Sequence, residues 1–376
     1  MRKIFINGLS AKAGGGKSIL DNYLTLLSKN SGDVKHFVLT PDPIKYQRFS
    51  SDIIMIVAIK KIFQSQIMAP LVYKIYLPHL IRKINPDVVF NLADIPISIK
   101  TIRQVFLFDW PYAAYRDSVV WKKMDLLSWI TKKIKLFYFV RFLDYIDTTI
   151  VQTETIKRRL ESLYPLKDIV VIPNAVTLEH TRNAKDFDFG LPNAPLLLCL
   201  SRYYPHKNFE ILLPLAKEIK RMSLDFKLVT TINPLEHKMA KVFLSRVTDL
   251  ELDDIILNIG NVDMDLTPAL YQKCDALLMP TLLETYCLPY IEAMKHRRVI
   301  LTSDMDFSRD VCGEAAVYFD PSDYLSILES IQEVFSSAKL RKQTVDAGTD
   351  RLKNLNSWEE VVQKYNTVLK NRVNYE

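Results

Sequence analysis

Residues 280–294 read Pro-Thr-Leu-Leu-Glu-Thr-Tyr-Cys-Leu-Pro-Tyr-Ile-Glu-Ala-Met and follow an apolar run at 276–279. The apolar run predicts a strand, and the residues after Pro289 have helical character. Glu284 should therefore lie on a loop at the carboxyl end of a strand, and Glu292 in the first turn of the next helix. Open α/β sheets bind ligands at that edge, where helix N-terminal N–H groups attract anions.

The two glutamates lie eight positions apart, and their carboxylates can accept hydrogen bonds from sugar and ribose hydroxyls. The segment therefore suits a ligand with a phosphate in the middle and hydroxyls at both ends. The alternative interpretation is a surface glutamate followed by a helix-start glutamate that the helix dipole stabilises.

The whole string resembles the E-x7-E signature of retaining glycosyltransferases of family 4, the glycosyl transferases group 1. The usual form has glycines after the first glutamate, whereas Thr285 and Cys287 stand in two of those places here. The resemblance implies an α/β chain with the GT-B fold. Two Rossmann-like domains would place their parallel sheets facing each other across a cleft, and a C-terminal helix would cross back to the first domain.

Further segments extend this resemblance along most of the chain, in the order and spacing of the family. They are residues 86–89, the Gln152-Thr153-Glu154 loop, the Ile-Pro-Asn-Ala-Val linker at 172–176, residues 308–321 and the helix start at 357–359.

The 376 residues are enough for two domains. Both halves alternate strand and helix signals, which predicts parallel sheets with helices on both faces. The predicted domains are residues 1–172, residues 173–356, and a terminal helix at 357–376 that packs back on the first domain. Residues 52–83 are expected to be helical in pieces. Strands are expected at 3–7, 36–40, 87–91, 104–108, 148–152, 196–200, 227–231, 255–259, 276–279, 299–302 and 316–318.

A basic turn follows the strand that opens the second half. Arg202 and Lys207 are five positions apart across this turn, so both side chains can point into the same crevice. Arginine offers phosphate a planar fork and lysine a movable point charge. The segment resembles the G-R-x4-K-N motif of the family, with Ser201 in place of glycine. The resemblance implies that both cations hold the donor diphosphate, and the alternative is a solvated basic turn.

The glycine-rich loop at 13–18 allows two interpretations. Gly16-Lys17-Ser18 matches the end of a Walker A loop, which would make the chain a P-loop NTPase or kinase. The first glycine of that motif would fall on Ala11, however, and no convincing Walker B aspartate follows. The family carries a Gly-Gly loop at this place, so the resemblance implies that Gly15 and Gly16 line the donor site.

The family usually has a histidine after a first-domain strand, facing the reacting sugar. Phe108 or Asp109 occupies that place here, and Asp109 is the only polar candidate. Its carboxylate can accept a hydrogen bond from a sugar hydroxyl or position the acceptor, or it can simply cap the turn before Pro111. The resemblance implies catalytic roles for Glu284, Arg202 and Lys207, and Asp109 completes the predicted catalytic set as a polar candidate to which the family role does not transfer. It implies donor contacts from Gly15, Gly16, Asn174, Arg202, Lys207, Val262, Thr285, Leu288 and Glu292.

Transfer from a nucleotide sugar releases a diphosphate, whose developing charge Arg202, Lys207 and a helix N-terminus can stabilise. The sequence has no Asp-x-Asp motif, so neither a metal nor another cofactor is expected. No carboxylate is clearly placed as a nucleophile. We therefore expect same-face attack by the acceptor rather than a covalent intermediate.

Charge is divided unevenly along the chain. Residues 1–172 hold 26 Lys+Arg and 14 Asp+Glu, which gives +12, and residues 173–376 hold 24 and 29, which gives −5. A basic half suggests an anionic partner, either nucleic acid or lipid headgroups. No RNA-recognition motif is present, so nucleic acid is not expected.

Residues 119–143 combine lysines with aromatic side chains, as do amphipathic helices that lie in a membrane interface. From Leu136 onward the segment also suits an ordinary core helix. An anionic membrane is the expected partner. The residues expected at the lipid contact are Trp121, Trp129, Lys122, Lys123, Lys132 and Lys133.

The four cysteines form no close pair, which suits a reducing compartment, and neither a signal peptide nor an apolar span of 18 residues is evident. These features and the resemblance predict a cytoplasmic, retaining, metal-independent hexosyltransferase at the inner face of the cell membrane. Its substrates would be a nucleotide sugar and a glycan or lipid-linked glycan of a surface polysaccharide, such as lipopolysaccharide O-antigen or capsule. The alternatives are a transferase acting on soluble acceptors, the P-loop enzyme, and a non-catalytic sugar-binding module.

Overall fold

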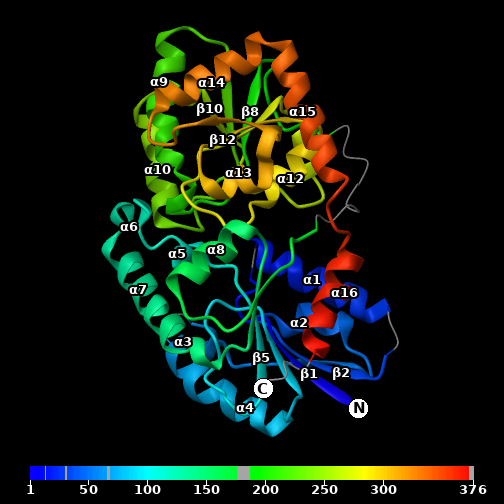
Figure 1. The fold of residues 1–376 in the computed structure, drawn as a ribbon. Helices are drawn as coiled ribbons and strands as arrows, with labels where there is room; N and C mark the ends of the chain where they lie inside the picture. The colour runs from blue at the N-terminus through cyan, green and yellow to red at the C-terminus, as the bar shows by residue number, and fades with distance from the viewer. Residues whose placement is uncertain (13, 30–31, 66–67, 176–186, 372–376) are drawn as a thin grey trace. The chain divides into compact units, whose positions relative to one another are not determined.

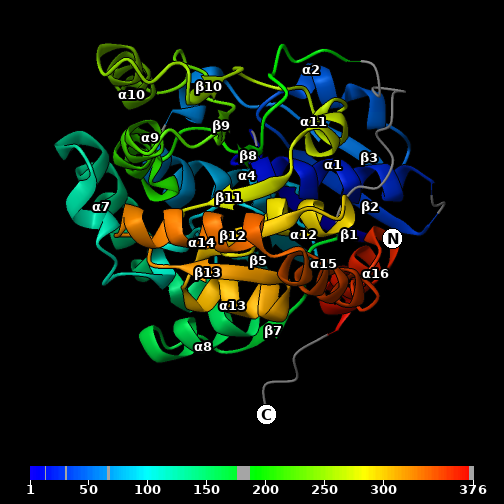
Figure 2. The same cartoon turned by 90° about the horizontal axis from the view of Figure 1, so that it is seen from above.

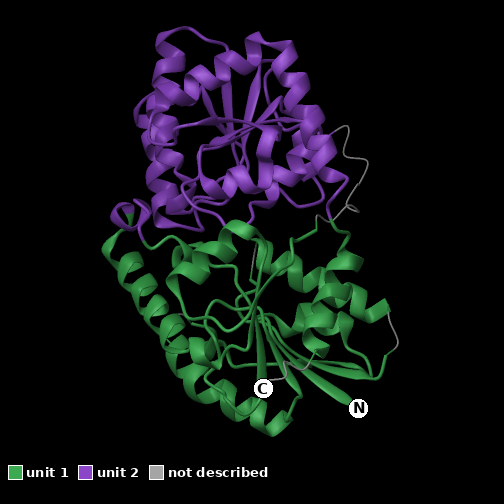
Figure 3. Cartoon of the chain, viewed as in Figure 1, with its two compact units in different colours: residues 1–116, 124–175, 356–376 green, residues 117–123, 176–355 purple. Residues whose placement is uncertain are grey.

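The computed structural model describes residues 1–12, 14–29, 32–65, 68–175 and 187–371. The chain divides into two compact units (Figure 3). Unit 1 comprises residues 1–116, 124–175 and 356–376, and unit 2 comprises residues 117–123 and 176–355. Each unit contains one parallel β-sheet with helices around it, as the alternating sequence pattern predicts (Figure 1).

Unit 1 has a seven-stranded sheet in the order β3-β2-β1-β4-β5-β6-β7. All neighbouring strands are parallel, and the central strands are buried, as expected for a sheet covered on both faces. The strands are β1 Arg2–Asn7, β2 Val34–Leu39, β3 Ile54–Val57, β4 Val88–Asn91, β5 Arg103–Leu107, β6 Thr148–Val151 and β7 Ile169–Val171.

The helices of unit 1 include two long ones, α1 and α7. The helices are α1 Gly14–Lys29, α2 Pro43–Tyr46, α3 Ala69–Leu71, α4 Leu77–Ile84, α5 Pro111–Ala114, α7 Leu126–Arg141, α8 Glu154–Leu163 and α16 Trp358–Lys370. A π-helical segment at Val72–Tyr76 joins α3 to α4, and single turns lie at Gln47–Phe49, Lys61–Gln64 and Leu143–Tyr145.

The expectation that residues 52–83 are helical in pieces did not include β3. Residues 54–57 read Ile-Met-Ile-Val and pair in parallel with β2 at the edge of the sheet. Three of these four residues are β-branched, which favours a strand once a neighbouring strand supplies the hydrogen bonds.

Unit 2 has a six-stranded parallel sheet in the order β10-β9-β8-β11-β12-β13, and Figure 2 shows the last four of these strands side by side. The strands are β8 Leu196–Cys199, β9 Lys227–Thr230, β10 Ile256–Asn258, β11 Ala276–Met279, β12 Val299–Ser303 and β13 Ala316–Phe319. The helices are α6 Val120–Lys123, α9 Leu212–Arg221, α10 Lys238–Asp249, α11 Thr267–Lys273, α12 Leu288–Lys295, α13 Asp306–Cys312, α14 Tyr324–Ser336 and α15 Ala338–Leu352. Single turns lie at Pro205–Lys207, Phe209–Ile211 and Gly313–Ala315.

Both faces of this sheet are buried, because successive strand residues point to opposite sides. On β8, Leu197 and Cys199 join the core formed with α9, α10 and α14, whereas Leu196 and Leu198 join the core formed with α11 and α12. A strand buried on both faces is a continuous apolar run, which is why Leu196–Cys199 was readable from the sequence.

Residues 117–123 leave unit 1 and pack within unit 2. The Lys123 ammonium donates a hydrogen bond to Asn208 Oδ1 at 2.9 Å, and Trp121 is buried. The sequence did not predict this excursion, and it removes Trp121 from the surface.

Helix α16 belongs to unit 1 and packs against α1 (Figure 1). Ser357 and Glu360 form a capping box at its start. Its last turn is held by two arginines of the sheet. Arg103 Nη1 donates to the Val368 carbonyl oxygen at 2.9 Å, and Arg2 Nη2 donates to that of Leu369 at 2.6 Å. These guanidinium groups satisfy carbonyls that the helix leaves unpaired and oppose its dipole.

Replacing Arg103 should therefore loosen α16. We expect Arg103→Gln to lower the free energy of unfolding by about 1–3 kcal/mol, because hydrogen bonds from a charged donor are lost. Chemical denaturation would measure this change, and hydrogen exchange should show faster exchange in α16. The exposed Arg82→Gln serves as the control. Equal stability of the two variants would contradict the role given to Arg103.

Candidate functional site

The turn after β8 is fixed by Asn208. This residue adopts a left-handed conformation with φ of 59°, and its side-chain amide donates to the Pro321 carbonyl oxygen at 2.9 Å. Asn208 also accepts the hydrogen bond from Lys123. Asparagine tolerates this conformation better than most residues, so the turn can carry Lys207 inward.

Lys207 meets Glu284 in the interior of unit 2. The lysine follows β8 and the glutamate follows β11, which is the neighbouring strand in the sheet. Lys207 Nζ lies 2.5 Å from Glu284 Oε1, and the two side chains are only 12% and 11% exposed. The structure thus brings together two predicted site residues that lie 77 positions apart in the sequence.

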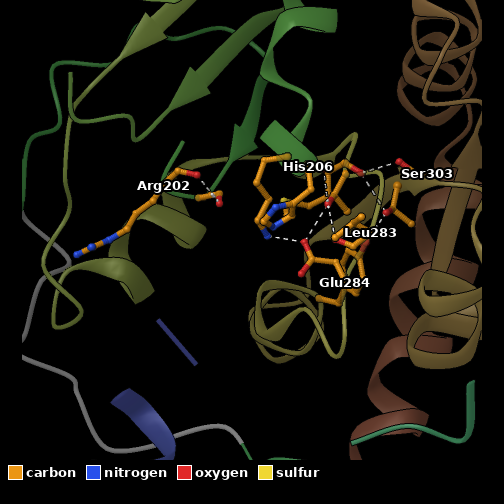
Figure 4. A network of polar contacts seen from close by, with 11 residues as sticks. Arg202, His206, Leu283, Glu284 and Ser303 are labelled. Carbon is orange, nitrogen blue, oxygen red and sulfur yellow. Dashed lines mark hydrogen bonds and ion pairs between the residues drawn. The ribbon is translucent and has the colours of Figure 1, made fainter. Parts of the chain in front are cut away.

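Thr281 and His206 tie the same two loops together (Figure 4). Thr281 Oγ1 lies 2.9 Å from Glu284 Oε1 and 3.1 Å from the His206 carbonyl oxygen. The Leu282 backbone N–H donates to that carbonyl oxygen at 2.7 Å. Glu284 therefore has two polar partners, and its carboxylate is held in place.

The environment keeps Lys207 charged. Burial lowers the pKa of Lys207, but the negative charge of Glu284 and the hydrogen bond to it outweigh burial and leave the pKa above its ordinary value. A buried ion pair of this kind has two fixed charges and few competing waters. Incoming phosphate oxygens or sugar hydroxyls would therefore meet ready-made partners.

Arg202 does not point toward Lys207, contrary to the expectation that both cations face one crevice. Figure 4 shows its side chain extending away from Glu284. Arg202 is 47% exposed, and its Nε lies 3.5 Å from Glu236 Oε2. The exposed pair is held weakly, because solvent screens it.

Glu292 lies one turn later in its helix than expected. Helix α12 begins at Leu288, so Glu292 is its fifth residue, and the first turn contains no acidic residue. The Tyr271 hydroxyl donates to Glu292 Oε2 at 3.0 Å. The Tyr271 ring stacks on the His296 ring, with 5.3 Å between the ring centroids. Burial raises the pKa of Glu292 above its ordinary value, although the hydrogen bond from Tyr271 opposes this shift.

The loop between the two glutamates keeps a backbone shape that glycine adopts easily. Cys287, which stands where the family has a glycine, has φ of 29° and caps the start of α12. Thr285 is buried beside it, and Leu288 and Val262 pack against the core that contains Tyr271. Burial raises the pKa of the Cys287 thiol well above its ordinary value, so this thiol is a packing group rather than a nucleophile.

In unit 1, Asp109 lies beside the glycine-rich start of α1. A β-carbon at Gly15 would lie 3.6 Å from Asp109 Oδ2, and one at Gly16 would lie 3.9 Å from it. Phe108 is fully buried against Phe139. Of the two candidates for the place of the family histidine, Asp109 is therefore the one that faces the glycine loop.

The remaining predicted residues have structural partners. Asn174 is buried and accepts a hydrogen bond from the Tyr365 hydroxyl at 3.1 Å, so it helps to hold α16. Lys17, the Walker-like lysine, lies within α1 and pairs with Asp21 at 2.6 Å. Among the described residues, no group of three His, Cys, Asp or Glu side chains is arranged to hold a metal ion.

Sequence reasoning missed Thr281, which anchors Glu284, and Tyr271, which holds Glu292. Thr281 lies three residues before Glu284, inside the quoted motif, so its neighbourhood was a usable signal. Tyr271 lies 21 residues before Glu292 on another helix, and no local pattern marks it.

Comparison with known proteins agrees with this geometry. Residues 181–351 match the family model described as Glycosyl transferases group 1. The O-antigen chain mannosyltransferase RfbU of Salmonella typhimurium is 27% identical over 182 residues. That alignment spans about half of each protein, 48% of this chain and 48% of RfbU. The C-terminal region of the chain, residues 181–351, is thus similar to the glycosyl transferases group 1, as the motifs predicted.

Solved structures show the same fold over nearly the whole chain. Sucrose-phosphate synthase from Thermosynechococcus elongatus matches with a TM-score of 0.74 at 14% identity, covering 98% of both chains. WaaG, described as a glycosyltransferase involved in lipopolysaccharide biosynthesis, matches with a TM-score of 0.74 at 11% identity, covering 98% of this chain and 100% of WaaG. HepE from Anabaena, solved with UDP-glucose, matches with a TM-score of 0.74 at 13% identity, covering 98% and 99%. The predicted GT-B fold class is confirmed, and the P-loop alternative is not favoured.

The contribution of the ion pair to stability can be measured by a double-mutant cycle. We expect Lys207→Met to lower the free energy of unfolding by about 3 kcal/mol, because it leaves a buried carboxylate without its cation. Adding Glu284→Gln should recover at least about 1 kcal/mol of that loss. Urea denaturation of the four proteins gives the coupling energy.

The exposed pair Lys220–Asp254, with an Nζ–Oδ1 distance of 3.1 Å, provides the matched control. Lys220→Met and Asp254→Asn should couple by no more than about 1 kcal/mol. Equal coupling in the two cycles would show that the Lys207–Glu284 pair is not specially placed.

Proposed function

We propose that this protein is a retaining glycosyltransferase that moves a hexose from a nucleoside-diphosphate sugar to a glycan or lipid-linked glycan. The observation that carries the proposal is the buried contact of Lys207 with Glu284 at the carboxyl ends of two adjacent parallel strands. The Lys207 ammonium can bind phosphate, and the Glu284 carboxylate can accept hydrogen bonds from sugar hydroxyls. The structure holds these two groups in direct contact.

The donor contacts follow from the chemistry of each group. Lys207 binds the diphosphate, and Arg202 joins it by exchanging its exposed contact with Glu236 for a phosphate oxygen. Glu284 accepts hydrogen bonds from the transferred sugar, and Glu292 accepts them from the ribose. Thr285, Leu288, Val262 and Asn174 remain proposed donor contacts, as do Gly15 and Gly16 of unit 1.

The reaction proposed is same-face substitution at the anomeric carbon. The acceptor oxygen forms a bond to this carbon while the bond to the diphosphate oxygen breaks, and the acceptor proton passes to the departing phosphate. Lys207 and Arg202 stabilise the negative charge that develops on the diphosphate. Asp109 is proposed to position the acceptor. The proposal includes no metal or other cofactor. Lys207 and Arg202 are proposed to neutralise the negative charge of the diphosphate leaving group.

The substrate class is supported by the names of similar proteins. RfbU is named an O-antigen chain mannosyltransferase, and WaaG is described as acting in lipopolysaccharide biosynthesis. HepE has been solved with UDP and with UDP-glucose. We therefore propose a role in surface polysaccharide synthesis, namely lipopolysaccharide O-antigen or capsule. A screen of nucleotide sugars for donor hydrolysis and transfer tests this role, and inactivity with every donor would oppose it.

The pKa of Glu292 gives a pH-dependent test of donor binding. Ribose hydroxyls donate to the ionised carboxylate, so binding of a nucleoside diphosphate should tighten as pH rises through the raised pKa of Glu292. Glu292→Gln should bind more weakly and lose this part of the pH dependence. Calorimetry between pH 5 and pH 8 measures both effects, and an unchanged pH profile would remove Glu292 from the site.

Folding stability provides the internal control for this experiment. A carboxyl group with a raised folded-state pKa contributes stability that is full below its unfolded pKa of about 4.3 and is lost as pH rises through the folded value. Wild type should therefore lose stability relative to Glu292→Gln as pH rises through the raised pKa of Glu292. This loss concerns the unliganded protein, so it separates burial of Glu292 from ligand binding.

Helix α7 supports the proposed membrane association. Its outer face carries large apolar side chains that are exposed, including Leu126 at 72%, Leu127 at 74% and Phe137 at 62%. The other exposed members are Trp129, Ile130, Ile134 and Val140. At 3.6 residues per turn this set spans roughly 160° of the helix circumference, a broad apolar face of the kind that interfacial helices have. Among the described residues, no helix is both long and apolar enough to cross a bilayer.

The expected lipid contact needs correction at several residues. Trp121 is buried in unit 2. Lys132 lies 4.7 Å from the Tyr112 ring, and Lys135 pairs with Asp94, so both face the body of unit 1. Burial lowers the pKa of Lys132. The apolar face of α7, with Lys133 on the same helix, therefore replaces the lysine cluster as the proposed contact.

We propose that the protein is cytoplasmic and lies peripherally at the inner face of the cell membrane through this face. Ile134→Ser with Phe137→Ser should weaken vesicle binding by at least about tenfold, because each buried apolar side chain contributes about 1.5–3 kcal/mol. Co-sedimentation with vesicles of varied anionic content and salt measures the effect. Part of the binding should persist at high salt, because apolar insertion is not screened.

A matched control replaces two exposed apolar residues elsewhere, Ile44 and Leu235, with serine. This control should bind vesicles like wild type. If both double variants bind equally, or if wild type binds no vesicle, the membrane proposal fails while the donor-site proposal stands.

A further inference from the structure

A basic hollow lies at the end of the unit 2 sheet that is opposite the candidate site. Its volume is about 710 Å³, and its floor includes Leu196, Ala276 and Val299, which are the first residues of β8, β11 and β12. Lys207 and Glu284 follow the other ends of β8 and β11. Four-residue strands separate the two places by roughly 13 Å or more.

Cations dominate the lining of this hollow. Lys273, Arg297, Arg298, Arg341 and Lys342 line it, and Asp275 is the only carboxylate among its described lining residues. One carboxylate oxygen of Asp275 accepts the Leu196 backbone N–H at 2.8 Å. This concentration of positive charge is notable because residues 173–376 carry a net charge of −5.

Two of the arginines are held in place by backbone groups. Arg341 Nη1 donates to the Val334 and Phe335 carbonyl oxygens, both at 2.7 Å, at the end of α14. Arg298 Nη2 donates to the Gln272 carbonyl oxygen at 3.2 Å. Arg298 Nε is buried and has no hydrogen-bond partner among the described residues. An unpartnered buried donor is costly.

We propose that this hollow is a second anion-binding site, which takes a small molecule bearing a phosphate or diphosphate group. Fixed guanidinium groups match phosphate oxygens, and Lys273 and Lys342 add mobile charges at the exposed rim. The volume is that of a small-molecule site. Apolar lining from Pro195, Val345 and Phe335 would accept the sugar or ring that carries the phosphate.

The test is calorimetric titration of the full chain with inorganic diphosphate and with inorganic phosphate. Lys273→Gln with Lys342→Gln should weaken one binding component by at least about tenfold, since two charge-assisted contacts are lost. Lys217→Gln with Lys241→Gln makes the same charge change on exposed parts of α9 and α10 and should stay within about twofold of wild type. Higher salt should weaken the affected component.

The two anion sites are distinguishable in this experiment. Binding at the Lys207 site should persist in the Lys273/Lys342 variant. If the proposed function is wrong, the binding component that is missing is the one at Lys207, not the one at Lys273 and Lys342. The second site is overturned if the Lys273/Lys342 variant and the Lys217/Lys241 control bind diphosphate equally, or if wild type shows no component beyond the one that Lys207→Met removes.

Discussion

Two opposite charges withdrawn from water hold the centre of unit 2 together. Lys207 and Glu284 are each nearly buried, so each needs the other, and their contact fixes the turn after β8 against the loop after β11. The shared His206 carbonyl oxygen, which accepts from Leu282 N–H, reinforces this attachment. Because the Glu284 loop continues directly into α12, the start of that helix and the position of Glu292 depend on the same contact.

The parallel sheet makes this contact possible. Residues 196–199 and 276–279 become neighbours only after a long crossover, and their register places Ala276 opposite Leu197. Both strands therefore end at one edge, and the polar residues that follow them converge there. The amino ends of the same strands define the opposite edge, where basic residues that precede β11 and β12 gather with basic residues of α15. The sheet of unit 2 thus separates two sites that contain cations, the Lys207–Glu284 site at one edge and the basic hollow at the other.

Sequence patterns predicted most of the fold because its central elements are strongly apolar. The run Ala276–Met279 has the predicted bounds, since burial on both sheet faces leaves a clear signature. β3 was missed because a short edge strand gains its hydrogen bonds from β2, and this partnership is not written in residues 54–57. Glu292 was misplaced by a turn because helix starts are poorly marked when the cap is Cys287.

The sequence predicted which residues belong to the candidate site, but not the directions in which their side chains point. Charge and spacing marked Lys207 and Glu284, whereas no local pattern showed that Arg202 extends toward Glu236, which lies 34 positions later on a different loop. Tyr271 was invisible for the same reason, since its role exists only once α11 and α12 are packed. Motifs therefore predict the backbone position of a site better than they predict its side-chain directions. Those directions depend on contacts with residues that are distant in the sequence.

The surface of α7 differs from the hydrophobic cores in that its large apolar side chains are exposed. Leu136 and Phe139 are the buried side chains of this helix, and Lys132 and Lys135 also contact unit 1. The exposed apolar residues of the helix leave a large hydrophobic area in water. Asp125 caps the helix start by accepting the Ser128 backbone N–H at 3.1 Å, so the apolar face is presented on a locally stabilised helix rather than on a loose segment. A rigid apolar face beside a basic sheet unit is the combination that a lipid interface would bind, which is why shape and charge together favour a membrane partner over a soluble one.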